Sequence, residues 1–113
     1  MPNPLEPLKI GTKSFQSRLF TGTGRYPNQK VMQASLLNSE CEMVTVAIRR
    51  VQSSESGHQG LLESIDWNQF WMLPNTAGCS DAQEAIRVAK LGRELAKVAG
   101  QEDNNFVKLE VIP

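Results

Sequence analysis

The segment MVTVAI, residues 43–48, decides the fold class of this chain. It lies within a strand expected over residues 42–50, and its near-continuous apolar run is typical of a parallel strand covered on both faces. Further strand patterns before and after it alternate with helical patterns. Such alternation predicts a parallel α/β sheet.

Three more strands are expected around this run. The first covers residues 18–23 and leads into Gly22-Thr23-Gly24, the next covers residues 70–73 and is stopped by Pro74, and the last covers residues 106–112. Proline cannot donate to a sheet ladder, which is why Pro74 is interpreted as a strand end. The sequence therefore predicts about four parallel strands.

Two longer helices and a short one, which is suggested by Leu61, Leu62 and Ile65, are expected between the strands. Pro27 opens the first, and its apolar positions are Val31, Ala34 and Leu37. Ser80 or Asp81 caps the second, which ends at Gly100. Asp81 with Glu84 forms a capping-box pattern, and the apolar stripe comprises Ala85, Val88, Ala89, Leu95, Ala96 and Ala99.

The expected organisation is a flexible leader over residues 1–7 and one domain over residues 8–113. The leader holds three prolines, and residues 8–15 after it are consistent with a short hairpin. Four strands do not close a barrel, and an open sheet with helices on both faces would need more chain. We therefore expect a fold truncated after its fourth strand.

Composition excludes several classes of function. The 12 basic residues balance the 12 acidic ones, so no basic field for nucleic acid or anionic lipid is present. No apolar run approaches the roughly 20 residues of a membrane helix. Cys41 and Cys79 lie far apart, with no histidine or cysteine nearby at metal-ligand spacing. We expect a soluble intracellular protein without a metal or cofactor, whose ligand is small or is another protein.

Lys108 and Glu110 are the leading catalytic candidates. In an expected strand over residues 106–112, alternation turns Val107, Leu109 and Val111 toward helices, and turns Lys108 and Glu110 toward the sheet interior. A desolvated lysine becomes a nucleophile near neutral pH and can form a Schiff base. The pattern alone also allows a structural ion pair, or an edge strand with both side chains in water.

Further candidates follow the carboxyl ends of the expected strands, where parallel α/β folds build their sites. Gly22 and Gly24 let a ligand approach the backbone, Arg49 closes the second strand, and Asn75 and Thr76 follow the third. A Gly-Thr-Gly triplet by itself is more often a tight turn.

Taken together, five stretches resemble the thiazole synthase family of thiamin biosynthesis, in family order. They are residues 17–24, 44–51, 72–78, 85–87 and 107–112. The approach over residues 101–106 is most similar to the cyanobacterial and plastid branch. The resemblance implies the N-terminal half of a (β/α)8 TIM barrel, from a cytoplasmic bacterial protein or one of the plastid stroma.

The resemblance also implies the chemistry. Lys108 matches the lysine that forms an imine with 1-deoxy-D-xylulose 5-phosphate, and Glu110 matches a carboxylate proposed for acid/base work. Sulfur comes from the thiocarboxylate of a ubiquitin-like carrier protein, and dehydroglycine supplies the remaining carbon and nitrogen. The full enzyme is expected to be a homo-oligomeric transferase, whereas a chain without the second carboxylate and the phosphate loops is expected to be inactive.

Two other readings remain open at this point. A class I aldolase barrel shares a lysine on a strand and needs no sulfur carrier. A half-barrel without activity could instead act as an assembly module, because four strands leave open edges that must be covered. We expect such a chain to self-associate or to stay molten.

Overall fold

The computed structural model describes residues 6–24, 26–52 and 60–113, so most of the expected leader lies outside the described residues. Its strands are β1 (Leu8–Ile10), β2 (Lys13–Phe15), β3 (Phe20–Thr21), β4 (Met43–Ala47) and β5 (Trp71–Asn75). Its helices are α1 (Gln29–Ser39), α2 (Ile48–Gln52) and α3 (Ala82–Val98).

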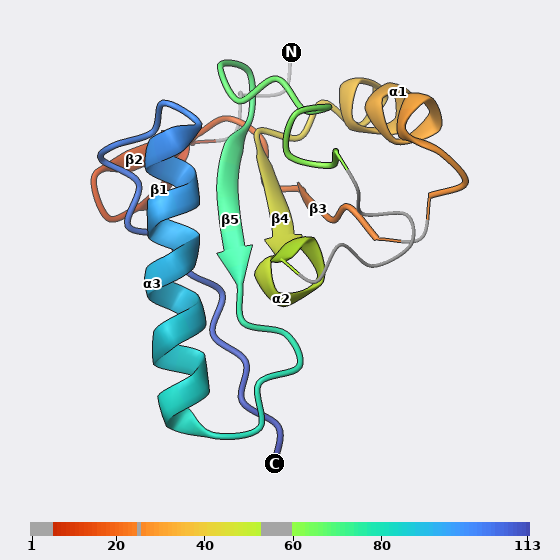
Figure 1. Ribbon diagram of the computed structural model, residues 1–113. Coiled ribbons are helices and arrows are strands. Elements are labelled where there is room, and N and C mark those ends of the chain that lie inside the picture. Colours follow the sequence, from red (N-terminus) through yellow and green to blue (C-terminus); the bar gives the residue numbers. More distant parts are fainter. Residues whose placement is uncertain (1–5, 25, 53–59) are drawn as a thin grey trace.

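The parallel sheet is confirmed, in the order β3-β4-β5 (Figure 1). Its register pairs Phe20 with Met43 and Met43 with Trp71. The predicted hairpin is confirmed as well, since β1 and β2 pair in antiparallel fashion. A short helix, α2, follows β4 directly, so the second strand ends at Ala47 rather than at Arg50 as predicted.

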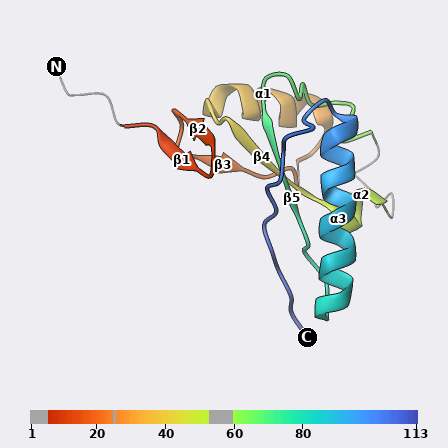
Figure 2. The same cartoon turned by 90° about the vertical axis from the view of Figure 1, so that its left-hand side faces the viewer.

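Helices cover one face of the sheet. Val44, Val46 and Met72 are fully buried on that face, in one core that also contains Met32 of α1 and Val88 of α3. The hairpin β1–β2 lies on the opposite side of the sheet from α3 (Figure 2). We call this second side the hairpin face.

The predicted apolar stripe of α1, made of Val31, Ala34 and Leu37, lies on the exposed side of the helix. Met32 and Leu36 are buried, whereas Val31 is 41% and Leu37 is 53% exposed. The Asn28 side chain accepts a hydrogen bond from the Val31 N–H, so α1 begins at Gln29 and not at Pro27, where the sequence predicted its start. At about 100° per residue, Ala34 is rotated by about 200° from both Met32 and Leu36, so the predicted and the buried stripes are on opposite sides of the helix.

The predicted limits of α3 are confirmed. The Asp81 side chain caps it by accepting from the Glu84 N–H at 2.8 Å. At the other end Gly100 has φ +94°, and its N–H donates to the Lys97 carbonyl while the Gln101 N–H donates to Ala96. This is the Schellman pattern, in which a left-handed glycine satisfies the last carbonyls of a helix.

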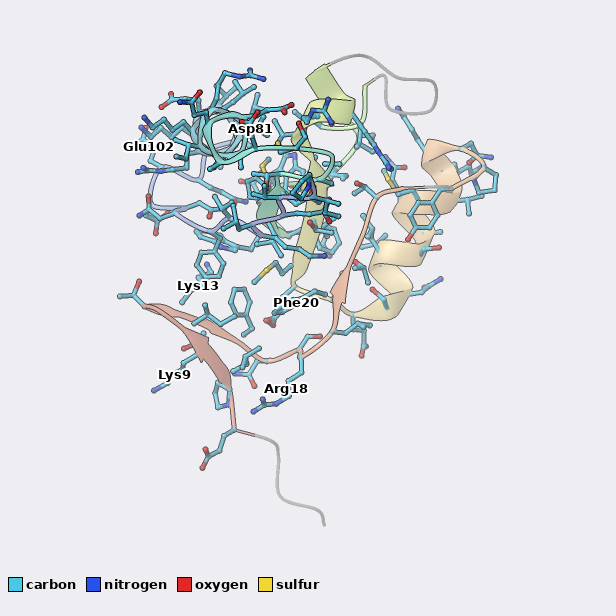
Figure 3. The ribbon with its side chains drawn as sticks, turned by 90° about the horizontal axis from the view of Figure 1, so that it is seen from below. Lys9, Lys13, Arg18, Phe20, Asp81 and Glu102 are labelled. Atoms are coloured by element: carbon cyan, nitrogen blue, oxygen red, sulfur yellow. The ribbon has the colours of Figure 1, made fainter. Side chains whose placement is uncertain are left out.

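An aromatic cluster fills the N-terminal end of the hairpin face. The Phe106 ring lies edge-on to the rings of Phe15 and Trp71, at centroid distances of 6.1 and 5.8 Å. Met43 is buried with them, and the Lys13 ammonium lies 4.0 Å from the Trp71 ring centroid. In Figure 3, Lys13 lies between hairpin and sheet, whereas Lys9 points away. The hairpin thus closes this end of the face.

The predicted fourth strand is reduced to a single bridge. Lys108 pairs in parallel with Asn75 of β5, with its N–H donating to the Pro74 carbonyl and its carbonyl accepting from the Thr76 N–H. The rest of residues 106–112 runs beside β5 without ladder pairing. The described sheet therefore has three strands plus this bridge.

Side chains replace the missing ladder on both sides of the bridge. Pro74 lies inside β5 instead of ending it, and it has no N–H for the Phe106 carbonyl. Asn104 takes over there, since its amide donates to the Met72 carbonyl and accepts from the Phe106 N–H. Pro74 thus prevents regular pairing between β5 and residues 106–112, although the two segments still run side by side.

The apolar side of residues 106–112 is uncovered, contrary to prediction. Leu109 is 70% exposed and Val111 is also exposed, so neither packs on a helix.

The architecture shown is a parallel α/β sheet with helices on one face and a hairpin on the other. No helix among the described residues is long and apolar enough to cross a membrane.

Candidate functional site

The carboxyl end of the hairpin face forms a small pocket. It has a volume of about 170 Å³ and lies where β3, β4 and β5 end. Three sequence-predicted residues, Gly22, Gly24 and Asn75, come together here. The complete lining is Gly22, Thr23, Gly24, Thr45, Ala47, Arg50, Asn75 and Ala77.

Asn75 is held by two hydrogen bonds across the end of the sheet. Its Oδ1 accepts from the Ala77 N–H at 3.1 Å, and its Nδ2 donates to the Thr45 Oγ1 at 2.9 Å. The Thr45 carbonyl in turn accepts from the Thr23 hydroxyl at 3.1 Å. The ends of three strands are therefore tied together by polar side chains, which fixes the shape of the pocket.

Neither pocket glycine is required by the protein itself. Gly22 and Gly24 have no positive φ. A Cβ added at Gly22 would meet Thr45 Cγ2 at 3.7 Å, and one at Gly24 would meet Arg50 Nη1 at 4.0 Å, both ordinary contacts. A Cβ at either position would therefore meet no clash, and the approach of a ligand to this backbone stays a prediction.

Arg49 does not lie where the sequence placed it. It belongs to α2, and its Nε forms an ion pair of 3.0 Å with Glu84 in the first turn of α3. Its guanidinium also packs over Gly78, where an added Cβ would clash with it. Arg49 thus ties α2 to the turn before α3 and is absent from the pocket lining, because the chain turns into a helix after Ala47.

Arg50, which the sequence reasoning missed, lines the pocket instead. The predicted second strand extended to residue 50, so Arg49 instead of Arg50 was expected at the site. The sequence does not decide which arginine reaches the pocket, because residues 48–50 are consistent with both a strand end and a first helical turn.

Lys108 is bridged to Asn75, which lines this pocket, although Lys108 itself is not part of the lining. Its bridge to Asn75 places both residues at the same level of the sheet, and directly paired residues project their side chains to the same face. Lys108 is therefore on the hairpin face, as predicted. Lys108 is exposed in the described part of the chain, however, so the prediction that it is desolvated is wrong there.

Glu110 is fixed next to Lys108 by Thr76. The Thr76 hydroxyl donates to the Glu110 carbonyl at 2.8 Å and accepts from the Glu110 N–H at 2.7 Å. The Glu110 carboxylate accepts from the Gly78 N–H at 3.1 Å. Thr76 itself is fully buried, so its observed role is to clamp the chain at Glu110, whereas it was predicted to bind substrate.

In the part of the chain that the structure describes, no group of three histidine, cysteine or acidic side chains is arranged so that it could hold a metal ion. Cys79 lies beneath the turn that carries Thr76 and is fully buried. Its carbonyl accepts from the Ile112 N–H, which holds the end of the segment after Glu110.

Comparison with known proteins gives a consistent match. The profile of the family described as "Thiazole biosynthesis protein ThiG" matches residues 9–113. The chain is 74% identical over 106 residues to the thiazole synthase of Prochlorococcus marinus (strain NATL1A), covering 94% of this chain and 40% of that protein. It is 66% identical over 113 residues to the thiazole synthase of Synechococcus sp. (strain CC9605), covering 99% of this chain and 42% of the relative. The chain thus spans about two fifths of the length of these relatives.

Proposed function

Because the chain belongs to the family of the thiazole biosynthesis protein ThiG, we propose that the whole protein is a thiazole synthase acting through Lys108. Its substrates are 1-deoxy-D-xylulose 5-phosphate, dehydroglycine and the thiocarboxylate of a ubiquitin-like carrier protein. The observation that carries this proposal is the bridge between Lys108 and Asn75, because Asn75 lines the pocket.

The first step is the formation of an imine. The neutral Lys108 amine adds to the ketone carbon of the sugar phosphate, and the resulting carbinolamine loses water to give the Schiff base. A proton must reach the departing hydroxyl, and another must leave the nitrogen. A nearby carboxyl group that takes up and releases protons serves both transfers.

Glu110 is the candidate for these proton transfers. It lies two residues beyond Lys108, and its carboxylate is oriented by the Gly78 N–H while its backbone is held by Thr76. A group held at both backbone and side chain loses little further freedom on reaching the reactive geometry. The same arrangement supports its proposed role in the later proton transfers of ring formation.

The remaining proposals concern the whole protein. We assign to it a closed TIM barrel, a homo-oligomeric state and a location in the bacterial cytoplasm, since the named relatives come from Prochlorococcus and Synechococcus. The three parallel strands, with helices on one face, are compatible with the first strand–helix units of such a barrel. Family membership favours this chemistry over that of a class I aldolase.

Borohydride trapping tests the role of Lys108. The whole protein is incubated with 1-deoxy-D-xylulose 5-phosphate and borohydride, and we expect the reduced ligand mass on Lys108 alone. Lys108→Ala and Lys108→Arg should abolish it, because a guanidinium stays protonated and cannot attack a carbonyl. Lys90→Ala, at an exposed position of α3, is the matched control. Labelling that persists in Lys108→Ala would refute the assignment.

One observation favours the second reading, that of an assembly module. Leu109 and Ile112 are 70% and 63% exposed on the segment beside β5, which offers an apolar surface for association. Light scattering of this chain, together with Leu109→Ser, tests it. Dimers or larger species that the substitution disperses would support the module, and a monodisperse monomer would exclude it.

A further inference from the structure

Gly78, in the turn between β5 and α3, is contacted by two charged side chains. Its φ is +88°, a left-handed conformation that glycine adopts without strain. Its N–H donates to the Glu110 carboxylate at 3.1 Å. The Arg49 guanidinium packs against its α-carbon, since a Cβ added there would collide with Nη1 and lie 3.4 Å from Cζ. The backbone donor that orients Glu110 is therefore packed against Arg49.

Glu84 holds Arg49 in this position. Arg49 belongs to α2, beside the carboxyl end of β4 (Figure 1). Glu84 Oε1 pairs with Arg49 Nε at 3.0 Å, whereas Nη1 is the nitrogen that lies against Gly78. Glu84 Oε2 accepts from the Ser80 N–H at 3.4 Å, and the Glu84 N–H is bound by the Asp81 side chain. A carboxylate anchored at the start of α3 thus fixes Arg49 over the turn that carries Gly78.

The position of the Glu110 carboxylate depends on this turn. Among the described residues, the Gly78 N–H is the one hydrogen-bond donor to that carboxylate, while Thr76 holds only the backbone of Glu110. With the guanidinium packed on its α-carbon, Gly78 cannot shift in that direction without displacing Arg49 from its pair with Glu84. For a reacting group, a displacement of about 1 Å can cost about 100-fold in rate.

We propose that Arg49 is a positioning residue for proton transfer. Its guanidinium, held by Glu84, packs on Gly78 and so keeps the Gly78 N–H directed at the Glu110 carboxylate. This rests on the proposed function, in which Glu110 takes up and releases the protons. Arg49 then contributes to the reaction without binding substrate.

A double-mutant cycle in the whole protein tests this role. Arg49→Met should lower kcat by about ten-fold and leave KM for the ketose phosphate unchanged, because a displaced Glu110 slows the reaction without removing a binding group. In the Glu110→Gln background the same change should have no further effect. The double variant should therefore fall about 100-fold, and not the roughly 1,000-fold of independent effects. Arg93→Met, an exposed loss of equal charge on α3, is the matched control.

Arg49→Lys guards against a loss of folding. It keeps the charge and can still pair with Glu84, but an ammonium has no planar group to lie on Gly78, so this variant should show the same loss of kcat. Wild-type kcat in Arg49→Lys would overturn the inference. Independent effects of the Arg49 and Glu110 substitutions would overturn it too, because they would show that Arg49 does not act through Glu110.

Hydrogen exchange at the Gly78 amide tests the contact without catalysis. We expect exchange to be about ten-fold faster in Arg49→Lys than in wild type, the effect of losing one hydrogen bond, and unchanged in Arg93→Met. Equal exchange in wild type and Arg49→Lys would overturn the inference. Absence of the imine at Lys108, or wild-type turnover in Glu110→Gln, would defeat the proposed function, while the exchange rates would still decide whether Arg49 holds Gly78 in place.

Discussion

The two ends of the hairpin face differ in what covers them. At the N-terminal end, Met43 and Trp71 are buried against Phe15 of the hairpin. Further along the same two strands, Thr45 and Asn75 line an open pocket. Alternation along a strand decides which face a side chain joins, but only the neighbouring elements decide whether that face is closed or open.

On the proposed function, this difference separates the residues that stabilise the fold from those that act on substrate. Buried aromatic rings contribute apolar area and edge-to-face contacts, which hold the hairpin to the sheet. Hydroxyl and amide groups at the other end are bonded to one another around an open pocket. Substitutions should therefore affect either the fold or the activity, according to the end at which they lie.

The largest expected effect is at the closed end. Phe15→Ala removes a ring that is almost fully buried between Phe20 and Phe106, and should lower the free energy of unfolding by about 3–5 kcal/mol. Denaturant unfolding of the whole protein measures this. Wherever the variant remains folded, imine trapping at Lys108 should persist. Loss of trapping in the folded variant would break the separation between the two ends.

At the open end, Glu110→Gln should have the opposite profile. The amide oxygen can still accept from the Gly78 N–H, so the free energy of unfolding should be unchanged, whereas turnover should fall about 100-fold because the proposed proton carrier is gone. Steady-state kinetics alongside thermal unfolding measure both effects. Turnover close to that of the wild type would return Glu110 to a structural role.

Thr76 should show an intermediate effect, because it belongs to the fold and supports the site. Thr76→Val leaves the Glu110 N–H without its acceptor and should cost about 1–3 kcal/mol of stability, with slower turnover as Glu110 loses its position. Thr76→Ser keeps the hydroxyl and is the matched control. If valine and serine behaved alike, the hydroxyl clamp would have no role.

The smallest expected effect concerns Cys79, beneath the open end. Burial raises the pKa of the Cys79 thiol, and the nearby Glu84 carboxylate adds to the shift. The folded protein then keeps a proton that the unfolded chain loses above about pH 8.5. The contribution of this thiol to stability is therefore complete below that pH and is lost as pH rises toward the folded pKa.

Chemical unfolding from pH 7 to 10 measures the effect, with Cys79→Ala as the comparison. The wild type should lose more stability than the variant over this range, since the variant lacks the titrating group. If the unfolding free energies of the two proteins changed equally with pH, the Cys79 thiol would not contribute to the pH dependence of stability.

The sequence by itself determined the parallel α/β class, the hairpin, the caps of α3 and the candidate pair Lys108 and Glu110. These follow from local rules, such as the apolar run of β4, the Asp81 cap and the alternation of side chains about Lys108. The resemblance added the family, which the match over residues 9–113 confirmed.

Tertiary structure alone decided which residues share the site. Arg49 and Arg50 are adjacent in sequence, yet α2 turns the first toward Glu84 and the second into the pocket. Pro74 lies inside β5 because its missing N–H faces the segment after Asn104, where a side chain replaces the ladder. Exchanges of this kind depend on partners about 30 residues away along the chain, and a local pattern carries no information on such partners.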